Sequence, residues 1–304
     1  MGELNITPYL YNAYGLNIYS EFPLSEFAGG CGRPDAFIRK GKIYAMPPRD
    51  AFCADTSWTT GKEAYRFVAN AGAFLIREGK EIIVDPVSEA DENYICRILL
   101  GLGLSILLHQ RGFLVLHGSA ISLKSRAKVF LGPSGSGKST IVAALCDRYP
   151  LVADDLVAIK ASAGDIKVYP AISNLKLFPD SALSTGYDLS ALPKISPEEE
   201  KRVAQPKGGC CIEPLPLGTI YFLKEGEKLQ ITSFRKKESM MELVRSTFSI
   251  GALRAGVNAT QHFMQCAIIA KEIPMYQLIR PHDITKLAES IAAVEEESTI
   301  AAMN

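Results

Sequence analysis

The chain has 304 residues, of which 47% are hydrophobic and 22% are charged, as in an ordinary globular protein. Lysine plus arginine equal aspartate plus glutamate at 33 each, and this balance argues against a nucleic-acid-binding or membrane-surface protein. The seven cysteines include no CxxC pair, so neither a disulfide framework nor a zinc site is predicted, and a reducing cytoplasm is favoured.

The sequence predicts neither a signal peptide nor a membrane span. The opening stretch MGELNITPYLYNAYG lacks a basic segment followed by an apolar core. The longest apolar run, residues 98–108, is too short to cross a bilayer and predicts a buried helix instead. We therefore expect a cytoplasmic protein whose partners include neither a membrane nor a nucleic acid.

Residues 1–88 are predicted to form a small β-rich N-terminal domain. Aromatic and β-branched residues recur near alternate positions in YLYNAYGLNIYSEF. Residues 63–86 predict three short strands with turns at 70–72 and 78–80. No pair of acidic or basic residues here suggests catalysis, so a structural or substrate-docking role is favoured.

Residues 89–304 are predicted to form an α/β domain. Its first helix is expected to be capped by Ser88 and to end near Gly112. Later segments alternate between predicted strands and helices, with one strand over 149–160 and a helix at the C-terminus. The polar segment 194–210 is expected to be an exposed loop or a short helix.

A β-hairpin is predicted just before the most informative motif of the chain. Its strands cover residues 113–122 and 127–132 and are joined by a tight turn near Ser125. If they pair, the numbers of facing residues add up to about 250. His117 and Gly118 would then lie opposite the first residues after the second strand.

Those residues read GPSGSGKS and fit the phosphate-binding pattern GxxxxGK[ST] at every fixed position. The glycines let successive N–H groups face a phosphate, the lysine reaches the β- and γ-phosphates, and the following hydroxyl binds Mg²⁺. An apolar strand enters the loop and a helix leaves it, so we predict binding of ATP with Mg²⁺. The predicted nucleotide-binding residues are Gly132, Ser134, Gly135, Ser136, Gly137, Lys138, Ser139 and Thr140.

Two adjacent aspartates, Asp154 and Asp155, follow a short apolar stretch sixteen residues after the lysine. One carboxylate at a strand end commonly holds Mg²⁺ through water, and a second can take the proton from an acceptor hydroxyl. Successive strand residues point to opposite faces, so only a strand end or a bulge would bring both into one cleft. The alternative is that Asp155 caps a turn.

Three further residues are candidates for the site. His117 in an apolar strand is often a core residue, but the hairpin would bring it beside the loop, where it could orient Asp155. Lys176 and Arg202 could neutralise phosphate charge, whereas Lys201 is expected to be a solvated surface residue.

The motifs LHGSA, GPSGSGKST and LVADD, in this order and spacing, resemble the HPr kinase/phosphorylase family. The resemblance implies a fold akin to ATP-dependent phosphoenolpyruvate carboxykinases, with a mixed sheet. It makes Lys138 and Ser139 the phosphate and Mg²⁺ ligands. It also makes Asp155 the general base, with Asp154 and His117 in support and Asp154 as a second metal ligand.

The chain also departs from that family. The Glu-Ile-Arg-Gly-Leu-Gly stretch expected after the aspartates is replaced by VYPAISNLKLFPD, which puts HPr recognition and a phosphorylase reaction in doubt. The whole pattern, with YNAYGLNIYSEFPL and LLHQRGFLVLHGSA, is more similar to HPr-kinase-related proteins of lasso-peptide gene sets. That narrower resemblance implies phosphorylation of the C-terminal serine of a peptide precursor.

Three functions therefore stay open from the sequence. The first is an ATP- and Mg²⁺-dependent kinase acting on a serine of a protein or peptide. The second is a small-molecule kinase for an amino acid or sugar, and the third is a nucleotide-responsive regulatory protein with little transfer activity. The choice between ATP and GTP and the formation of a homo-oligomer also stay open.

Overall fold

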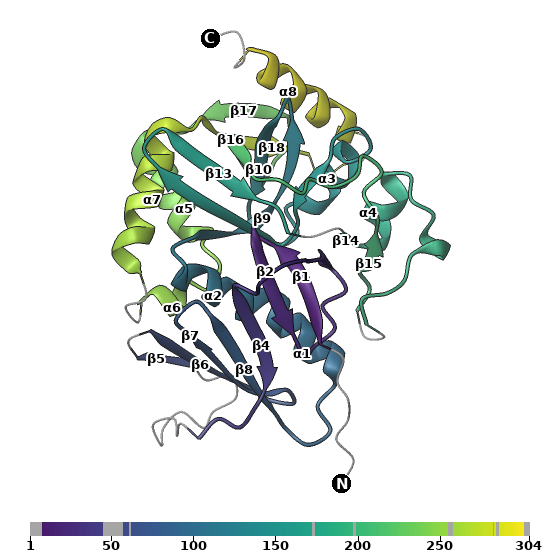
Figure 1. Ribbon diagram of the computed structural model, residues 1–304. Helices are drawn as coiled ribbons and strands as arrows, with labels where there is room; N and C mark the ends of the chain where they lie inside the picture. Colours follow the sequence, from purple (N-terminus) through teal and green to yellow (C-terminus); the bar gives the residue numbers. More distant parts are fainter. Residues whose placement is uncertain are drawn as a thin grey trace. The chain divides into compact units, whose positions relative to one another are not determined.

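The structure is a computed structural model that describes residues 8–44, 57–60, 62–171, 174–196, 199–254, 258–281, 283 and 286–300. The described residues divide into two compact units (Figure 1). The first comprises residues 1–115 and 248–264, and the second comprises residues 116–247 and 265–304. The first unit thus takes in more of the chain than residues 1–88, and the domain boundary expected there stays a prediction.

The first unit is built on a mixed sheet, to which eight strands belong within the described ranges. Its order is β3-β1-β2-β4-β8-β7-β6-β5, with β2–β4 and β4–β8 parallel and the other pairs antiparallel. The strands are β1 (Tyr9–Ala13), β2 (Leu16–Ser20), β3 (Ala28–Gly29), β4 (Ala36–Lys40), β5 (Ser57–Thr60), β6 (Glu63–Val68), β7 (Gly72–Arg77) and β8 (Glu81–Pro86). The predicted β-rich region and its three strands over 63–86 are confirmed.

Turns with left-handed backbone join these last three strands. Asn70 (φ 66°) precedes β7, and Glu78 (φ 54°) and Gly79 (φ 64°) precede β8. Asparagine and glycine tolerate this region, which is why the turns fall at these positions.

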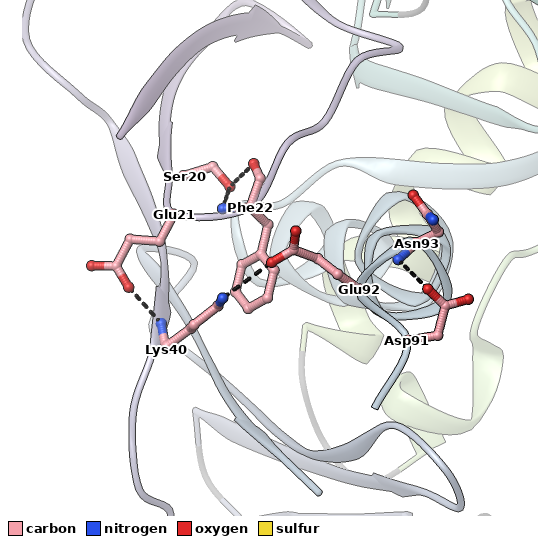
Figure 2. A network of polar contacts seen from close by, with 7 residues as sticks. All are labelled: Ser20, Glu21, Phe22, Lys40, Asp91, Glu92 and Asn93. Atoms are coloured by element: carbon pink, nitrogen blue, oxygen red, sulfur yellow. Dashed lines mark hydrogen bonds and ion pairs between the residues drawn. The ribbon is translucent and has the colours of Figure 1, made fainter. Parts of the chain in front are cut away.

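A local network of polar contacts links β4 to the helix that follows the sheet (Figure 2). The Lys40 ammonium lies 3.1 Å from Glu92 and 5.0 Å from the centre of the Phe22 ring, and the Lys40 backbone N–H donates to Glu21 at 2.8 Å. Both charged side chains of the ion pair are well exposed. This is a surface network in which every charge shown has an opposite charge or a donor beside it.

The predicted helix over residues 89–112 forms as three consecutive segments, α1 (Glu92–Ile98), the π-helical η2 (Leu99–Gly103) and α2 (Leu104–Gln110). Its predicted cap was wrong, because Asp91 and not Ser88 is the N-cap. Asp91 is extended (φ −69°, ψ 119°) and accepts from the Asn93 N–H at 3.0 Å. The chain between Ser88 and Asp91 turns through Glu89 at φ 65°, which delays the helix.

The second unit holds another mixed sheet, with the order β10-β9-β12-β13-β16-β18-β17, in which β11 pairs with β9 and β10 also pairs with β16. A separate pair, β14–β15, is antiparallel. The strands are β9 (Leu114–Leu123), β10 (Arg126–Leu131), β11 (Leu151–Ala153), β12 (Leu156–Ser162), β13 (Asp165–Tyr169), β14 (Leu175–Leu177), β15 (Arg202–Ala204), β16 (Leu215–Glu225), β17 (Gln230–Ser233) and β18 (Met275–Arg280). With two mixed sheets and helices, the protein is a mixed α/β fold.

The hairpin register matters most for the site. β10 pairs with β9 so that Leu131 faces Gly118 and Arg126 faces Leu123, which confirms the predicted hairpin. Lys124 (φ 52°) and Ser125 (φ 57°) form its two-residue turn, the conformation that matches the twist of the strands. The ladder ends at the Leu131–Gly118 pair, so His117 directly precedes the last paired residue of β9 and Gly132 directly follows the last residue of β10.

Two predicted segments differ from the structure. The single strand expected over 149–160 is broken into β11 and β12, because Asp155 adopts φ 68° between them. The segment 194–210, expected to be a loop or short helix, contains β15, whose backbone pairs with β14. Part of this segment forms a strand because it pairs with a strand distant in the sequence, and composition does not reveal such a partner.

The remaining helices cover the sheets or connect their strands. They are α3 (Lys138–Leu145), α4 (Pro179–Ser184), η3 (Leu189–Ala191), α5 (Lys236–Arg245), α6 (Ile250–Arg254), α7 (Ala259–Glu272) and α8 (Leu287–Ile300). α3 packs on β10, α4 and α8 over a core that includes Ile141, Val142 and Leu145. None of the helices in the described ranges combines the length and apolar character of a membrane span.

Candidate active site

The glycine-rich loop (residues 132–139) connects the end of β10 to the start of α3. Gly132 has φ 146° and Gly137 has φ 86°, conformations that favour glycine. A Cβ on Gly132 would lie 2.8 Å from the Leu223 carbonyl oxygen. The loop is therefore held close to β16, and Gly137 turns the chain into α3 so that the first N–H groups of the helix are free to face an anion.

Lys138, the first residue of α3, is buried at 8% exposure and folds back over the loop. Its ammonium donates to the carbonyls of Gly132 at 2.8 Å and Pro133 at 2.9 Å. Burial lowers the Lys138 pKa, whereas the charges of Asp155 and Asp154 oppose that shift. Neutral carbonyls compensate a buried ammonium less well than a phosphate does, so this cation suits an anionic ligand.

The hairpin of β9 and β10 brings His117 beside the loop. Its backbone N–H donates to the Ser246 carbonyl at 2.8 Å, and the next residue, Gly118, donates to the Asp155 carbonyl at 3.2 Å. A Cβ on Gly118 would lie 2.6 Å from the Phe130 carbonyl oxygen, which explains the glycine. Burial and the Lys138 charge lower the His117 pKa, so its imidazole is neutral at pH 7.

The two aspartates have different environments although they are neighbours. Asp154 is 3% exposed, and its two oxygens accept from the Ser119 hydroxyl at 2.6 Å and the Lys176 backbone N–H at 3.0 Å. Burial raises the Asp154 pKa, with a smaller contribution from the charge of Asp155. The side chain of Asp155 is 45% exposed and lies 3.8 Å from the Lys176 ammonium. The left-handed backbone of Asp155 separates the two carboxylates, one inward and one toward solvent.

Two cavities lie along the loop, entirely within the second unit. The small cavity, of about 330 Å³, is lined by the middle and the C-terminal end of the loop and by Asp155. The large cavity, of about 850 Å³, lies along residues 132–136 and is bounded by β16, β18 and the end of α5. His117, Ser134 and Gly135 line both. The small cavity is lined by His117, Ser134, Gly135, Gly137, Lys138, Ser139, Thr140, Asp155, Phe178, Asp180, Ser181, Lys201 and Arg280.

Most residues predicted from the sequence meet in this region, but not all in the way expected. Lys176 contacts both aspartates. Arg202 lines neither cavity and donates to the Leu192 carbonyl at 3.2 Å. Lys201, expected on a solvated surface, lines the small cavity with its ammonium 5.1 Å from the centre of the Phe178 ring. Lys201 directly precedes β15, whereas Arg202 is the first residue of that strand.

Several other polar residues of the site were not predicted from the sequence. Ser119 could have been found, because it lies two residues after His117 on the same strand and thus shares its side of the sheet. Asp180 and Ser181 belong to α4, and Arg280 ends β18, with no local motif around them. Thr140 bonds Ser181 at 2.8 Å.

The residues of the small cavity fit a magnesium nucleotide. The Ser139 hydroxyl and the carboxylates of Asp155 and Asp180 are oxygen donors of the kind that Mg²⁺ prefers. Lys138 and Arg280 are buried cations in the same cavity. Within the described residues, no group of three or more histidine, cysteine and acidic side chains could hold a metal alone. Mg²⁺ with few protein ligands is usual where phosphates supply the rest.

Comparisons with known proteins add little to this geometry. No protein-family model matches the sequence, and no curated protein matches it. Among solved structures, the chain is similar to the Hpr(Ser) kinase/phosphatase from Coxiella burnetii. That similarity has 14% sequence identity, covers 61% of this chain and 97% of that chain, and gives a TM-score of 0.31.

Proposed function

We propose that this protein is an ATP- and Mg²⁺-dependent phosphotransferase that acts on a serine hydroxyl of a protein or peptide. One observation carries the proposal. Lys138, Ser139 and the exposed carboxylate of Asp155 line a single cavity at the glycine-rich loop. Phosphoryl transfer needs a cradle for the phosphates and a group that orients or deprotonates the acceptor, and this cavity offers both.

In the proposed reaction, the loop N–H groups and Lys138 bind the phosphates of ATP. Asp155 accepts the proton of the acceptor hydroxyl while the oxygen of that hydroxyl bonds to the γ-phosphorus. The bond from that phosphorus to the bridging oxygen breaks, and ADP leaves. Bound Mg²⁺, held by Ser139 and a cavity carboxylate, would neutralise phosphate charge. Asp154 holds the turn in place through Ser119 and the Lys176 backbone.

His117 is proposed to position Asp155 rather than to transfer a proton itself. A neutral imidazole beside Lys138 adds no repulsion to that cation, and its ring hydrogen-bonds the backbone of Asp155. Its neighbour Gly118 pairs with Leu131, the last residue of β10 before the loop. From its place on β9, His117 would thus help to hold Asp155 on the side of the phosphate where the acceptor hydroxyl binds.

The large cavity favours a peptide over a free amino acid as the acceptor. Its volume of about 850 Å³ is near the upper end of ordinary ligand pockets, and it shares three residues with the small cavity. A segment of several residues could lie there while one side chain reaches the phosphate. The C-terminal serine of a lasso-peptide precursor stays one specific prediction within this class.

The test is incubation with labelled ATP, Mg²⁺ and separate pools of serine-containing peptides, free amino acids and sugars. Transfer to peptides by wild type, and its loss in Lys138→Ala, is the expected result. Label found only in a small molecule would replace the peptide by a metabolite as acceptor. Nucleotide binding with slow ADP release and no transfer to any pool would contradict the proposed kinase activity. A nucleotide-responsive regulatory protein would then be the remaining alternative.

A further inference from the structure

Arg280 is a buried cation at the glycine-rich loop, and no carboxylate of the described residues forms an ion pair with it. It ends β18, which runs parallel to β16, as β16 does to β10, so all three strands end at the same edge of the sheet. The residue is 5% exposed. Its Nε is buried without a hydrogen-bond partner, and no ion pair joins its guanidinium to a carboxylate in the described part of the chain.

The guanidinium is pressed against the start of α3. A Cβ on Gly137 would lie 2.0 Å from Nη1 of Arg280, so this glycine leaves room for the arginine. Gly137 caps α3, and the N–H groups of the first turn point the same way as the positive end of the helix. Two positive features, a helix N-terminus and a buried arginine, therefore face one small volume.

The charges around the small cavity show an excess of cations. Lys138, Lys201 and Arg280 line it against the carboxylates of Asp155 and Asp180, while His117 is neutral. Arginine stays protonated in proteins, so burial cannot remove its charge. The opposite charge that acts electrostatically on Arg280 is Glu225, an exposed residue that pairs with it from β16. A buried, uncompensated cation destabilises the free protein unless a ligand supplies the anion.

We propose that Arg280 binds the phosphate chain of the nucleotide, as a second cation alongside Lys138. This inference rests on the proposed function and adds to it a residue from a strand far from the loop in sequence. A guanidinium gives two parallel hydrogen bonds to a phosphate, which an ammonium does not. The ligand class it recognises is a polyphosphate anion, with the nucleoside held elsewhere.

The test compares wild type, Arg280→Met, Arg280→Lys and the control Arg148→Met in binding ATP·Mg²⁺, inorganic tripolyphosphate and adenosine by calorimetry. Arg148 is an exposed arginine of the same unit and is paired with Glu295 at 2.8 Å, so its loss should not change binding. Loss of a charged hydrogen-bond donor should lower the affinity of Arg280→Met for ATP and tripolyphosphate roughly tenfold to a hundredfold. Adenosine affinity should stay unchanged, and Arg280→Lys should restore affinity only in part.

Thermal unfolding of the free proteins separates binding from support of the fold. If Arg280 has no ion-pair partner until an anion binds, Arg280→Met without ligand should melt at or above the wild-type temperature, since the substitution removes an unpaired buried charge. Equal tripolyphosphate affinity in Arg280→Met and wild type would overturn the inference. So would a lower melting temperature with unchanged affinity, which would make Arg280 a structural residue. Failure of wild type to bind any of these phosphates would instead refute the proposed function itself.

Discussion

The two units treat buried ionisable groups differently. In the first unit, burial and the neighbouring His109 lower the pKa of His262 to about 4, so His262 is neutral at pH 7. In the second unit, Arg280 cannot lose its proton, and Lys138 donates to neutral backbone carbonyls. A buried histidine can lose its charge on folding, whereas a buried cation that keeps its charge is suited to an anionic ligand.

The surface of the first unit gives the opposite case. Lys40 and Glu92 are exposed and paired in the network of Figure 2, where neither group needs a ligand. Substitutions in the first unit should therefore affect stability alone, and substitutions of the loop and its neighbours should affect ligand binding or turnover. Five experiments test this division.

The largest effect is expected from Asp155→Asn. Removing a general base typically slows a reaction by about 10²–10⁴-fold, while binding of the ground-state nucleotide does not need it. Single-turnover transfer from labelled ATP should fall by that factor, with ATP·Mg²⁺ affinity close to wild type. Asp165→Asn, at an exposed carboxylate paired with Lys167, serves as the control. Transfer at the wild-type rate in Asp155→Asn would make Asp155 a structural turn residue.

Lys138→Ala should come next. The ammonium is expected to exchange its carbonyl partners for phosphate oxygens, and loss of such a charged hydrogen bond lowers affinity by roughly tenfold to a hundredfold. Calorimetric titration with ATP and Mg²⁺ measures this. Lys228→Ala removes an exposed lysine of the same unit and should bind like wild type. Equal affinities for all three proteins would contradict nucleotide binding at the loop.

Asp154→Asn separates a positioning residue from a metal ligand. The amide cannot accept from both Ser119 and the Lys176 N–H as the carboxylate does, so the free energy of unfolding should fall by about 1–3 kcal/mol. Urea unfolding gives that value, and a Mg²⁺ titration of ATP binding should match wild type. A weaker dependence of binding on Mg²⁺ would support the metal-ligand role that the sequence predicts for Asp154.

The buried histidine of the first unit makes stability depend on pH. Because the His262 pKa falls from 6.5 to about 4 on folding, the unfolded chain binds more protons between these values. Stability is then present above pH 6.5 and is lost as pH falls toward 4, on the order of 1–2 kcal/mol at pH 5. His262→Gln should flatten this slope in urea unfolding without altering ATP affinity. An unchanged slope would mean that His262 is not buried in its neutral form.

The smallest effect is expected from Glu92→Gln. An exposed ion pair contributes roughly 0.2–1 kcal/mol, so unfolding should shift by no more than that, and less at high salt. Lys40 keeps its contact with the Phe22 ring in this variant. Nucleotide affinity should be unchanged, and any loss of affinity would break the division between the two units.

Several parts of this protein could be predicted from local signals in the sequence. The GxxxxGK[ST] run, the alternation in residues 63–86 and the hairpin around Ser125 each follow from backbone preferences over a few residues. The register of the hairpin could also be predicted, because a two-residue turn fixes which residues of the two strands face each other. The sequence alone thus predicts His117 beside the loop, and the β9–β10 pairing agrees.

Which side chains face the cavity depends on contacts between elements far apart in the sequence. Asp154 and Asp155 have the same chemistry in the sequence, but the left-handed turn at Asp155 turns one inward to Ser119 and leaves the other exposed. Lys201, which directly precedes β15, lines the cavity, whereas Arg202, the first residue of that strand, does not. Arg280 reaches the loop because β16 lies between β10 and β18, a parallel arrangement that brings together residues more than a hundred positions apart. Such contacts depend on strand order, which no short stretch of sequence encodes.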